Sequence, residues 1–134
     1  MLGNSSACNP SLDEAKEHIN NLDLTCVINR MSADPHKTGW VRKEAVICCR
    51  MYKNYLFLLK KYPSKVIPPS KQIDEFWHQH ILFTRRYHED SIKIFGKYLH
   101  HQPGEGTRES IKYFRKLFDE VTQELYFSEY GEYL

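Results

Sequence analysis

Histidine and carboxylate side chains gather in one stretch of this sequence, and their spacing is the first indication of chemistry. Asp74, His78 and His80 lie within two helical turns of one another, and His100 and His101 follow in a turn. Imidazole and carboxylate groups are common ligands of zinc and related metals, and histidine is the most frequent general base. One hypothesis is therefore a metal- or histidine-dependent enzyme that uses these five residues, with Zn or another divalent transition metal as its cofactor.

Helical phase separates the two neighbouring histidines. Apolar residues recur at three- and four-residue steps over 71–95, which predicts one long helix. His78 and His80 would then point about 200° apart, so they could not bind one metal ion together. His80 falls on the apolar face, whereas His78 lies with Asp74 at its exposed edge. Asp74 and His78 fit a metal pair, a carboxylate that orients an imidazole, or a surface pair, which is the commonest outcome.

A buried His80 needs hydrogen-bond partners for both ring nitrogens. Its neighbours Phe76 and Thr84, one turn away, cannot supply both, so a group from another helix or from the turn at His100 and His101 must reach it. Three arrangements meet this need: a hydrogen-bonded structural histidine, a metal site completed by His100 or His101 and an acid, and a general base lining a pocket. The first is the usual fate of a lone histidine on an apolar face.

The elements that must position these residues are all predicted to be helices. The patterns place them at 11–21, 22–31, 40–62, 71–95 and 107–125, with a proline-rich extended connector at 63–70. Ser11 with Glu14 forms a capping box, and Ser70 is placed to cap the histidine-bearing helix. The fold expected is all-α, a compact bundle of four to six helices around that central helix. It forms a single helical domain over 11–134, with residues 1–10 as a flexible N-terminus.

The last predicted helix carries an apolar stripe that should face the core. Its inward residues are expected to be Ile111, Phe114, Leu117, Phe118, Val121 and Leu125.

Composition and charge exclude several classes of protein. The 19 basic and 17 acidic residues give a net charge of +2 and are spread along the chain, so no nucleic-acid partner is expected. No signal peptide or membrane span is recognisable, which predicts a soluble protein, cytoplasmic where it is synthesised.

The four cysteines lack C-x-x-C spacing and are expected to be reduced. Neither a Gly-x-Ser-x-Gly elbow nor a glycine-rich phosphate loop is present.

The motif around the histidines resembles a known family. The matching positions are the segment 69–82, followed by Thr84, Tyr87, Asp90, Phe95, Gly96, Leu99, His100, His101, Gln102 and Pro103. They are similar to the glycine-rich-domain-protein-like family, whose members carry an I/V-D-x-x-W-H-x-H core followed by Y, F-G and H-x-P elements. The segments upstream of this motif also resemble small bacterial members, so the similarity covers approximately 22–106. The long glycine-rich tail of the plant members is absent, and Ser91 stands where many relatives have cysteine.

That resemblance implies a helical domain without a defined activity. It also implies a linked group of residues, which consists of Asp74, Trp77, His78, His80, Tyr87 and His101.

The function favoured by the sequence is a protein-interaction module. Aromatic residues exceed what a core of this size needs, and four of them lie beside acids near the C-terminus: Tyr126, Phe127, Tyr130 and Tyr133. Aromatic anchors with a polar rim are typical of protein interfaces. The expected partner is a protein, which the module would bind and in one version inhibit or regulate, and a homodimer is an alternative.

The acidic C-terminus faintly resembles the acidic tails of bacterial secreted effectors. The expected functions therefore include that of an effector or a regulator of an effector. In this hypothesis no catalytic residue and no cofactor are expected.

Overall fold

The structure is a computed structural model that describes residues 9–134, and every regular element among them is helical. The all-α bundle predicted from the sequence is confirmed. Residues 1–8, most of the predicted flexible N-terminus, lie outside the described residues. The helices are α2 (Leu12–Asn20), α3 (Thr25–Ser32), α4 (Pro35–Thr38), α5 (Arg42–Lys61), α6 (Lys71–Leu82), α7 (Thr84–Phe95), α8 (Arg108–Leu117), the π-helical turn η1 (Phe118–Thr122) and α9 (Gln123–Tyr130).

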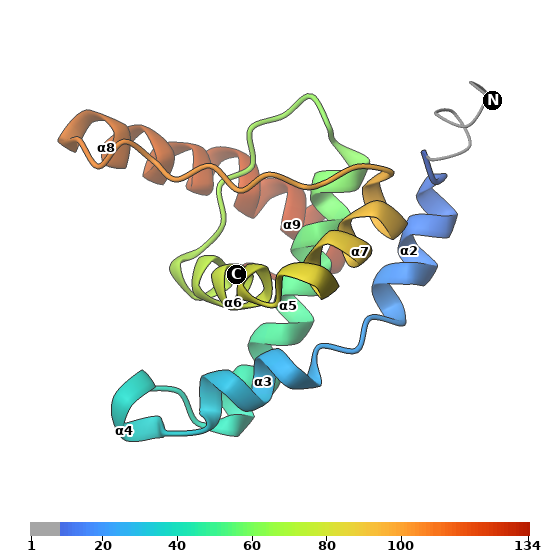
Figure 1. Cartoon of the computed structure of the whole chain (residues 1–134). Coiled ribbons are helices and arrows are strands. Elements are labelled where there is room, and N and C mark those ends of the chain that lie inside the picture. The colour runs from blue at the N-terminus through green and yellow to red at the C-terminus, as the bar shows by residue number, and fades with distance from the viewer. Residues whose placement is uncertain (1–8) are drawn as a thin grey trace.

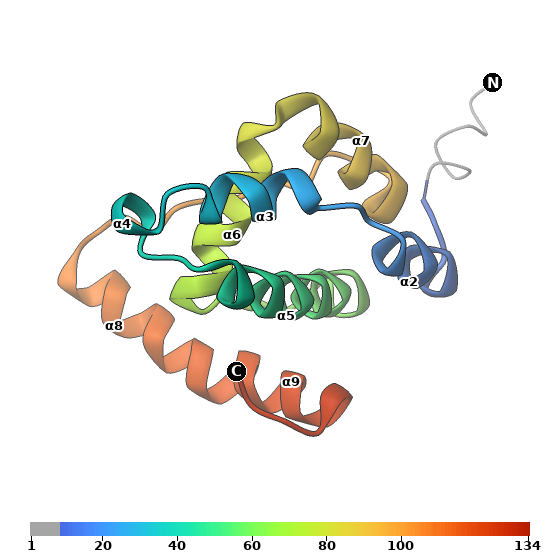
Figure 2. The same ribbon diagram turned by 90° about the horizontal axis from the view of Figure 1, so that it is seen from below.

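Helix α5 is the axis of the bundle. It contacts α2, α3, α6 and α9, and α6 crosses beside it (Figure 1). Figure 2 shows α3 and α7 on one side of α5 and the α8–α9 rod on the other. One face of this helix is buried, and its largest fully buried side chains are Tyr52, Tyr55 and Leu58. The core is therefore built mainly from bulky aromatic residues, which bury a large area each.

Helix ends follow the capping signals in the sequence. The Ser11 hydroxyl accepts from the Glu14 amide, and the Glu14 carboxylate accepts from the Ser11 amide, which confirms the capping box. The Ser70 hydroxyl likewise accepts from the Ile73 amide at the start of α6. Gly96 ends α7 in the left-handed region with a φ of 74°, which a residue with a side chain rarely adopts.

The prediction of a single helix over 71–95 is wrong, because the structure divides this segment into two helices at Phe83. Phe83 has φ −85° and ψ 70°, ends α6 and begins α7, although no glycine or proline marks the position. The break allows side chains ten residues apart to meet: Trp77 with Tyr87, and His80 with Asp90. In a straight helix such residues would lie about 15 Å apart along the axis. Tertiary hydrogen bonds stabilise the break, so local sequence did not reveal it.

Helix α8 does not pack its apolar stripe into the core, contrary to the prediction for Ile111 and Phe114, whereas Val121 and Leu125, further along the same predicted helix, do pack against the core. None of its residues is buried, and Ile111 and Phe114 are 52% and 37% exposed. The α8–η1–α9 segment forms a continuous rod whose α9 end contacts α5 while α8 extends away from it (Figures 1 and 2). The Thr122 hydroxyl in η1 donates to the Pro68 carbonyl over 2.7 Å and so joins the rod to the connector.

None of the helices in the described part is both long enough and apolar enough to cross a membrane.

Candidate interaction groove

His80 is held in the interior between three helices. Its side chain, on α6, is 1% exposed, as predicted. The Tyr52 hydroxyl of α5 lies 2.7 Å from Nδ1, and an Asp90 carboxylate oxygen of α7 lies 2.9 Å from Nε2. Both partners come from other helices, and neither was identified from the sequence.

These contacts assign proton positions to His80. Tyr52 is fully buried, and burial raises the pKa of its phenol well above the ordinary value, so it remains protonated. If Tyr52 donates to Nδ1, then Nε2–H donates to Asp90, and both ring nitrogens and the Tyr52 hydroxyl have a partner. The opposite proton placement at Nδ1 would leave the Tyr52 proton without an acceptor. The arrangement therefore matches the hydrogen-bonded structural histidine among the three alternatives.

A second hydrogen-bonded chain ties the segment after α7 to the bundle. The Trp77 indole N–H donates to the Tyr87 hydroxyl over 2.8 Å, and that hydroxyl donates to the Leu99 carbonyl over 2.6 Å. Burial raises the pKa of Tyr87 to about 12, so its proton stays in place at neutral pH. Leu99 is thereby fixed directly before His100 and His101.

His101 completes this arrangement on the surface side. Its ring stacks on Trp77 with centroids 3.9 Å apart, and its Nε2 lies 2.7 Å from an Asp74 carboxylate oxygen. The expected pairing of Asp74 with His78 is therefore wrong: the partner of Asp74 comes from 27 residues further along the chain. His78 is exposed, as predicted, because it points away from the packed face of α6.

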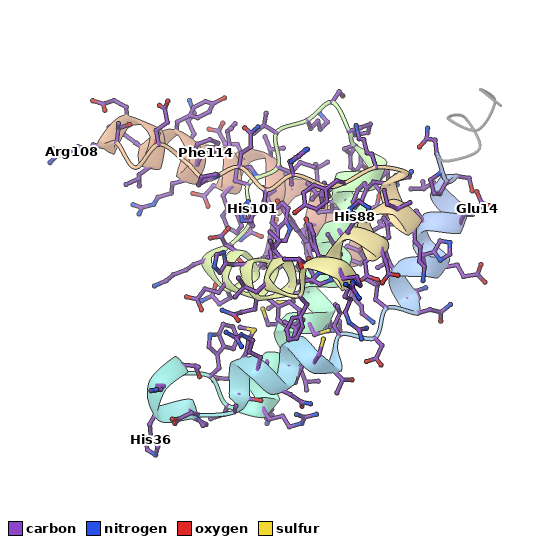
Figure 3. The ribbon with its side chains drawn as sticks, viewed as in Figure 1. Glu14, His36, His88, His101, Arg108 and Phe114 are labelled. Atoms are coloured by element: carbon purple, nitrogen blue, oxygen red, sulfur yellow. The ribbon has the colours of Figure 1, made fainter. Side chains whose placement is uncertain are left out.

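A groove opens between this region and α8. Its volume is about 1830 Å³, and its lining includes Met51, Tyr55, Trp77, His101, Ile111, Phe114 and Phe118. The floor is formed by α5 and α6, and the exposed apolar stripe of α8 forms one wall. Figure 3 shows Phe114 on α8 and, in that view, His101 between α8 and α6. No pattern in the sequence indicated the groove, because the apolar stripe of α8 has the same spacing as a stripe that faces a core.

The five predicted metal ligands do not converge. His80 uses both nitrogens on Tyr52 and Asp90, while His101 is paired with Asp74. Across residues 9–134, no three His, Cys, Asp or Glu side chains are placed to hold one metal ion. Burial also raises the pKa of the Cys48 thiol to about 12, so this cysteine is a poor nucleophile.

The four C-terminal aromatics expected to bind a partner divide into two kinds. Tyr126 is 0% exposed and accepts a hydrogen bond from the Asn54 amide, so its assignment to a surface anchor is wrong. Tyr130 is half-buried and donates to the Asn54 carbonyl. Phe127 and Tyr133 are exposed and stack on each other with centroids 4.6 Å apart.

Comparison with known proteins places the chain in a family. The model of the UCP032817-like family matches residues 14–119, which is most of the chain, and the protein therefore belongs to that family. The resemblance to the glycine-rich-domain-protein-like family is overturned by this match, since nothing in the comparisons indicates that family. No curated protein and no solved structure matches the chain.

Proposed function

We propose that this chain is a protein-interaction module whose groove receives an apolar segment of a partner protein. The observation that carries the proposal is the exposed apolar wall of α8 facing an aromatic floor. Exposed apolar surface of this kind marks interaction sites in folded proteins. The groove, at about 1830 Å³, also exceeds the roughly 300–1,000 Å³ typical of small-molecule pockets.

The polar residues near the groove support binding in preference to catalysis. His80 is buried, and both of its nitrogens are engaged, so it has no free position for a substrate proton. Tyr87 and Trp77 are likewise occupied in holding Leu99. These contacts fix the floor in one shape, and a preformed site loses less conformational entropy when a partner binds.

Site-specific photo-crosslinking tests this proposal. A benzophenone amino acid replaces Ile111 in the groove, and in a matched control it replaces Ile47 on α5, which is 45% exposed and does not line the groove. In cells that produce the protein, the variant at position 111 should form a discrete adduct with one partner, and the control should not. The partner, once identified and purified, should bind the unmodified chain.

A second substitution checks that the adduct depends on the groove. Phe114→Ser removes an apolar side chain from the same wall and should reduce the crosslink from position 111 at least tenfold. Identical adducts from positions 111 and 47, or a purified partner whose affinity Phe114→Ser leaves unchanged, would contradict the proposal.

A further inference from the structure

We infer that the occupant of the groove is an acidic amphipathic helix of a partner protein. This inference rests on the proposed function and specifies the chemistry of the partner. Three features carry it: the kind of backbone that forms the groove, the shape of its wall, and the charge on that wall.

The backbone around the groove favours a helical occupant. Its long sides are α5, α6 and α8, whose interior backbone groups are already paired within each helix. The connector that borders it holds Pro68 and Pro69, which have no amide N–H to donate. An extended peptide would find no free strand edge among the described residues, whereas a helix satisfies its own backbone before it docks.

The shape of the wall also suits a helix. Ile111, Phe114 and Phe118 stand three and four positions apart, so they form one continuous apolar ridge along the rod. A ridge of this kind packs into the groove between side chains of a second helix. A helix of about 10 Å diameter fills roughly 120 Å³ per residue, so a groove of about 1830 Å³ matches about 15 residues of helix.

The positive charge on the wall favours an occupant with negative charge. Helix α8 carries Arg108, Lys112, Arg115 and Lys116 against one carboxylate, Glu109. Arg115 lines the groove, as does Lys71 at the start of α6. Among the described residues, the acidic side chain that lines the groove is that of Asp74, and it is paired with His101. Acidic residues flanking an apolar stripe would meet these cations, and complementary charge of this kind speeds association and favours the matching partner.

The same charge argues against a second copy of this chain. Reciprocal docking through the groove would bring two α8 helices together, each with four cations and one carboxylate. Like charges placed face to face destabilise an interface.

A displayed library tests the inference with no assumption about the partner. Random 18-residue peptides are selected against the full chain, and the enriched sequences should show apolar residues at helical spacing and a net negative charge. A synthetic peptide from this set should bind at least tenfold more weakly to Phe114→Ser. Its affinity should also fall at least tenfold for the double variant Lys71→Glu/Arg115→Glu, which reverses the two cations that line the groove, and it should fall as the salt concentration rises.

Matched variants show that these losses are specific. Ile47→Ser and Lys43→Glu alter exposed positions of α5 outside the groove and should change the affinity by less than about twofold. Circular dichroism and thermal melting establish that every variant is folded.

The outcomes separate this inference from the proposed function. Enriched peptides that are neutral, basic or non-helical, but still sensitive to Phe114→Ser, would overturn the acidic helix and leave the groove as a binding site. A dimer in analytical ultracentrifugation that Phe114→Ser dissociates would make a second copy the occupant and overturn it too. Peptides insensitive to every groove variant, or no enrichment, would overturn both.

Discussion

The imidazole of His80 joins three helices through its two nitrogens, and its removal should therefore destabilise the whole fold. His80→Ala leaves the buried Tyr52 hydroxyl and the Asp90 carboxylate without their partner. A buried polar group that loses its partner costs about 1–3 kcal/mol, and lost packing adds to this. We expect the free energy of unfolding, measured with urea, to fall by at least that amount.

His78→Ala is the matched control, because it removes the same side chain from an exposed position two residues away. Its effect should stay within about 0.5 kcal/mol. Equal losses for the two variants would mean that the contacts of His80 do not stabilise the fold.

Tyr87 is the second residue on which several elements depend. Tyr87→Phe keeps the ring but removes the hydroxyl that accepts from Trp77 and donates to Leu99. The buried indole N–H then loses its acceptor, and we expect a cost of about 1–3 kcal/mol in urea unfolding. Hydrogen exchange of amides near Leu99 should also become faster. Unchanged exchange there would show that this hydroxyl does not fix the segment.

For single residues, the sequence predicts whether a side chain is buried better than it predicts which group that side chain contacts. Helical phase alone placed His80 inside and His78 outside, because both positions follow from the spacing of apolar residues around them. The resemblance grouped Asp74 with His101, but helical phase paired Asp74 with His78 and did not indicate the direct contact with His101. That contact depends on the path of the segment after α7, which no local pattern determines.

Among the elements, the break at Phe83 and the exposure of α8 have the same origin. Both depend on contacts between segments that are remote in sequence, while periodicity reports only which side of a helix is apolar. The pattern of α8 is that of a buried helix, yet the described part of the chain supplies no element to cover Ile111. An amphipathic face therefore predicts that a helix will be covered, but not whether its own chain covers it.

A pair of isoleucines tests whether the α8 stripe is free of the core. Ile73→Ser removes a side chain that is fully buried on α6, and large-to-small changes at such sites cost about 2–5 kcal/mol. Ile111→Ser makes the same change on α8, where the side chain is largely in solvent, and should alter stability by less than about 0.5 kcal/mol. Chemical unfolding of both variants measures the difference. A loss at position 111 comparable to that at 73 would place α8 in the core.

In the molecule as a whole, tyrosine hydroxyls connect the helices to the segments between them. Tyr52 bonds to His80, Tyr55 donates to the Ile67 carbonyl of the connector, and Tyr87 donates to Leu99. The three-residue spacing of Tyr52 and Tyr55 places them on one face of α5, but the groups that their hydroxyls contact lie on other segments, which this spacing does not indicate. The groove is bounded by the segments that these hydroxyls hold, so its shape depends on their protonation.

Alkaline pH should therefore unfold the protein through these phenols. Burial raises the pKa of Tyr52 and Tyr55, and it raises that of Tyr87 to about 12, against about 10 in an unfolded chain. Below about pH 10 the folded and unfolded states bind the same phenolic protons. Above it the unfolded state loses them first, so stability falls by as much as about 1.4 kcal/mol per pH unit for each such tyrosine.

The measurement is urea unfolding at a series of pH values, combined with tyrosinate absorbance. The buried tyrosines should ionise only as the helical circular dichroism is lost. Tyr55→Phe removes one of the titrating groups, so its stability should be lower at neutral pH but should decline less steeply above about pH 10. Full tyrosinate absorbance near pH 10 with the helices intact would show that solvent reaches these hydroxyls, and it would contradict their role in joining the bundle to the groove.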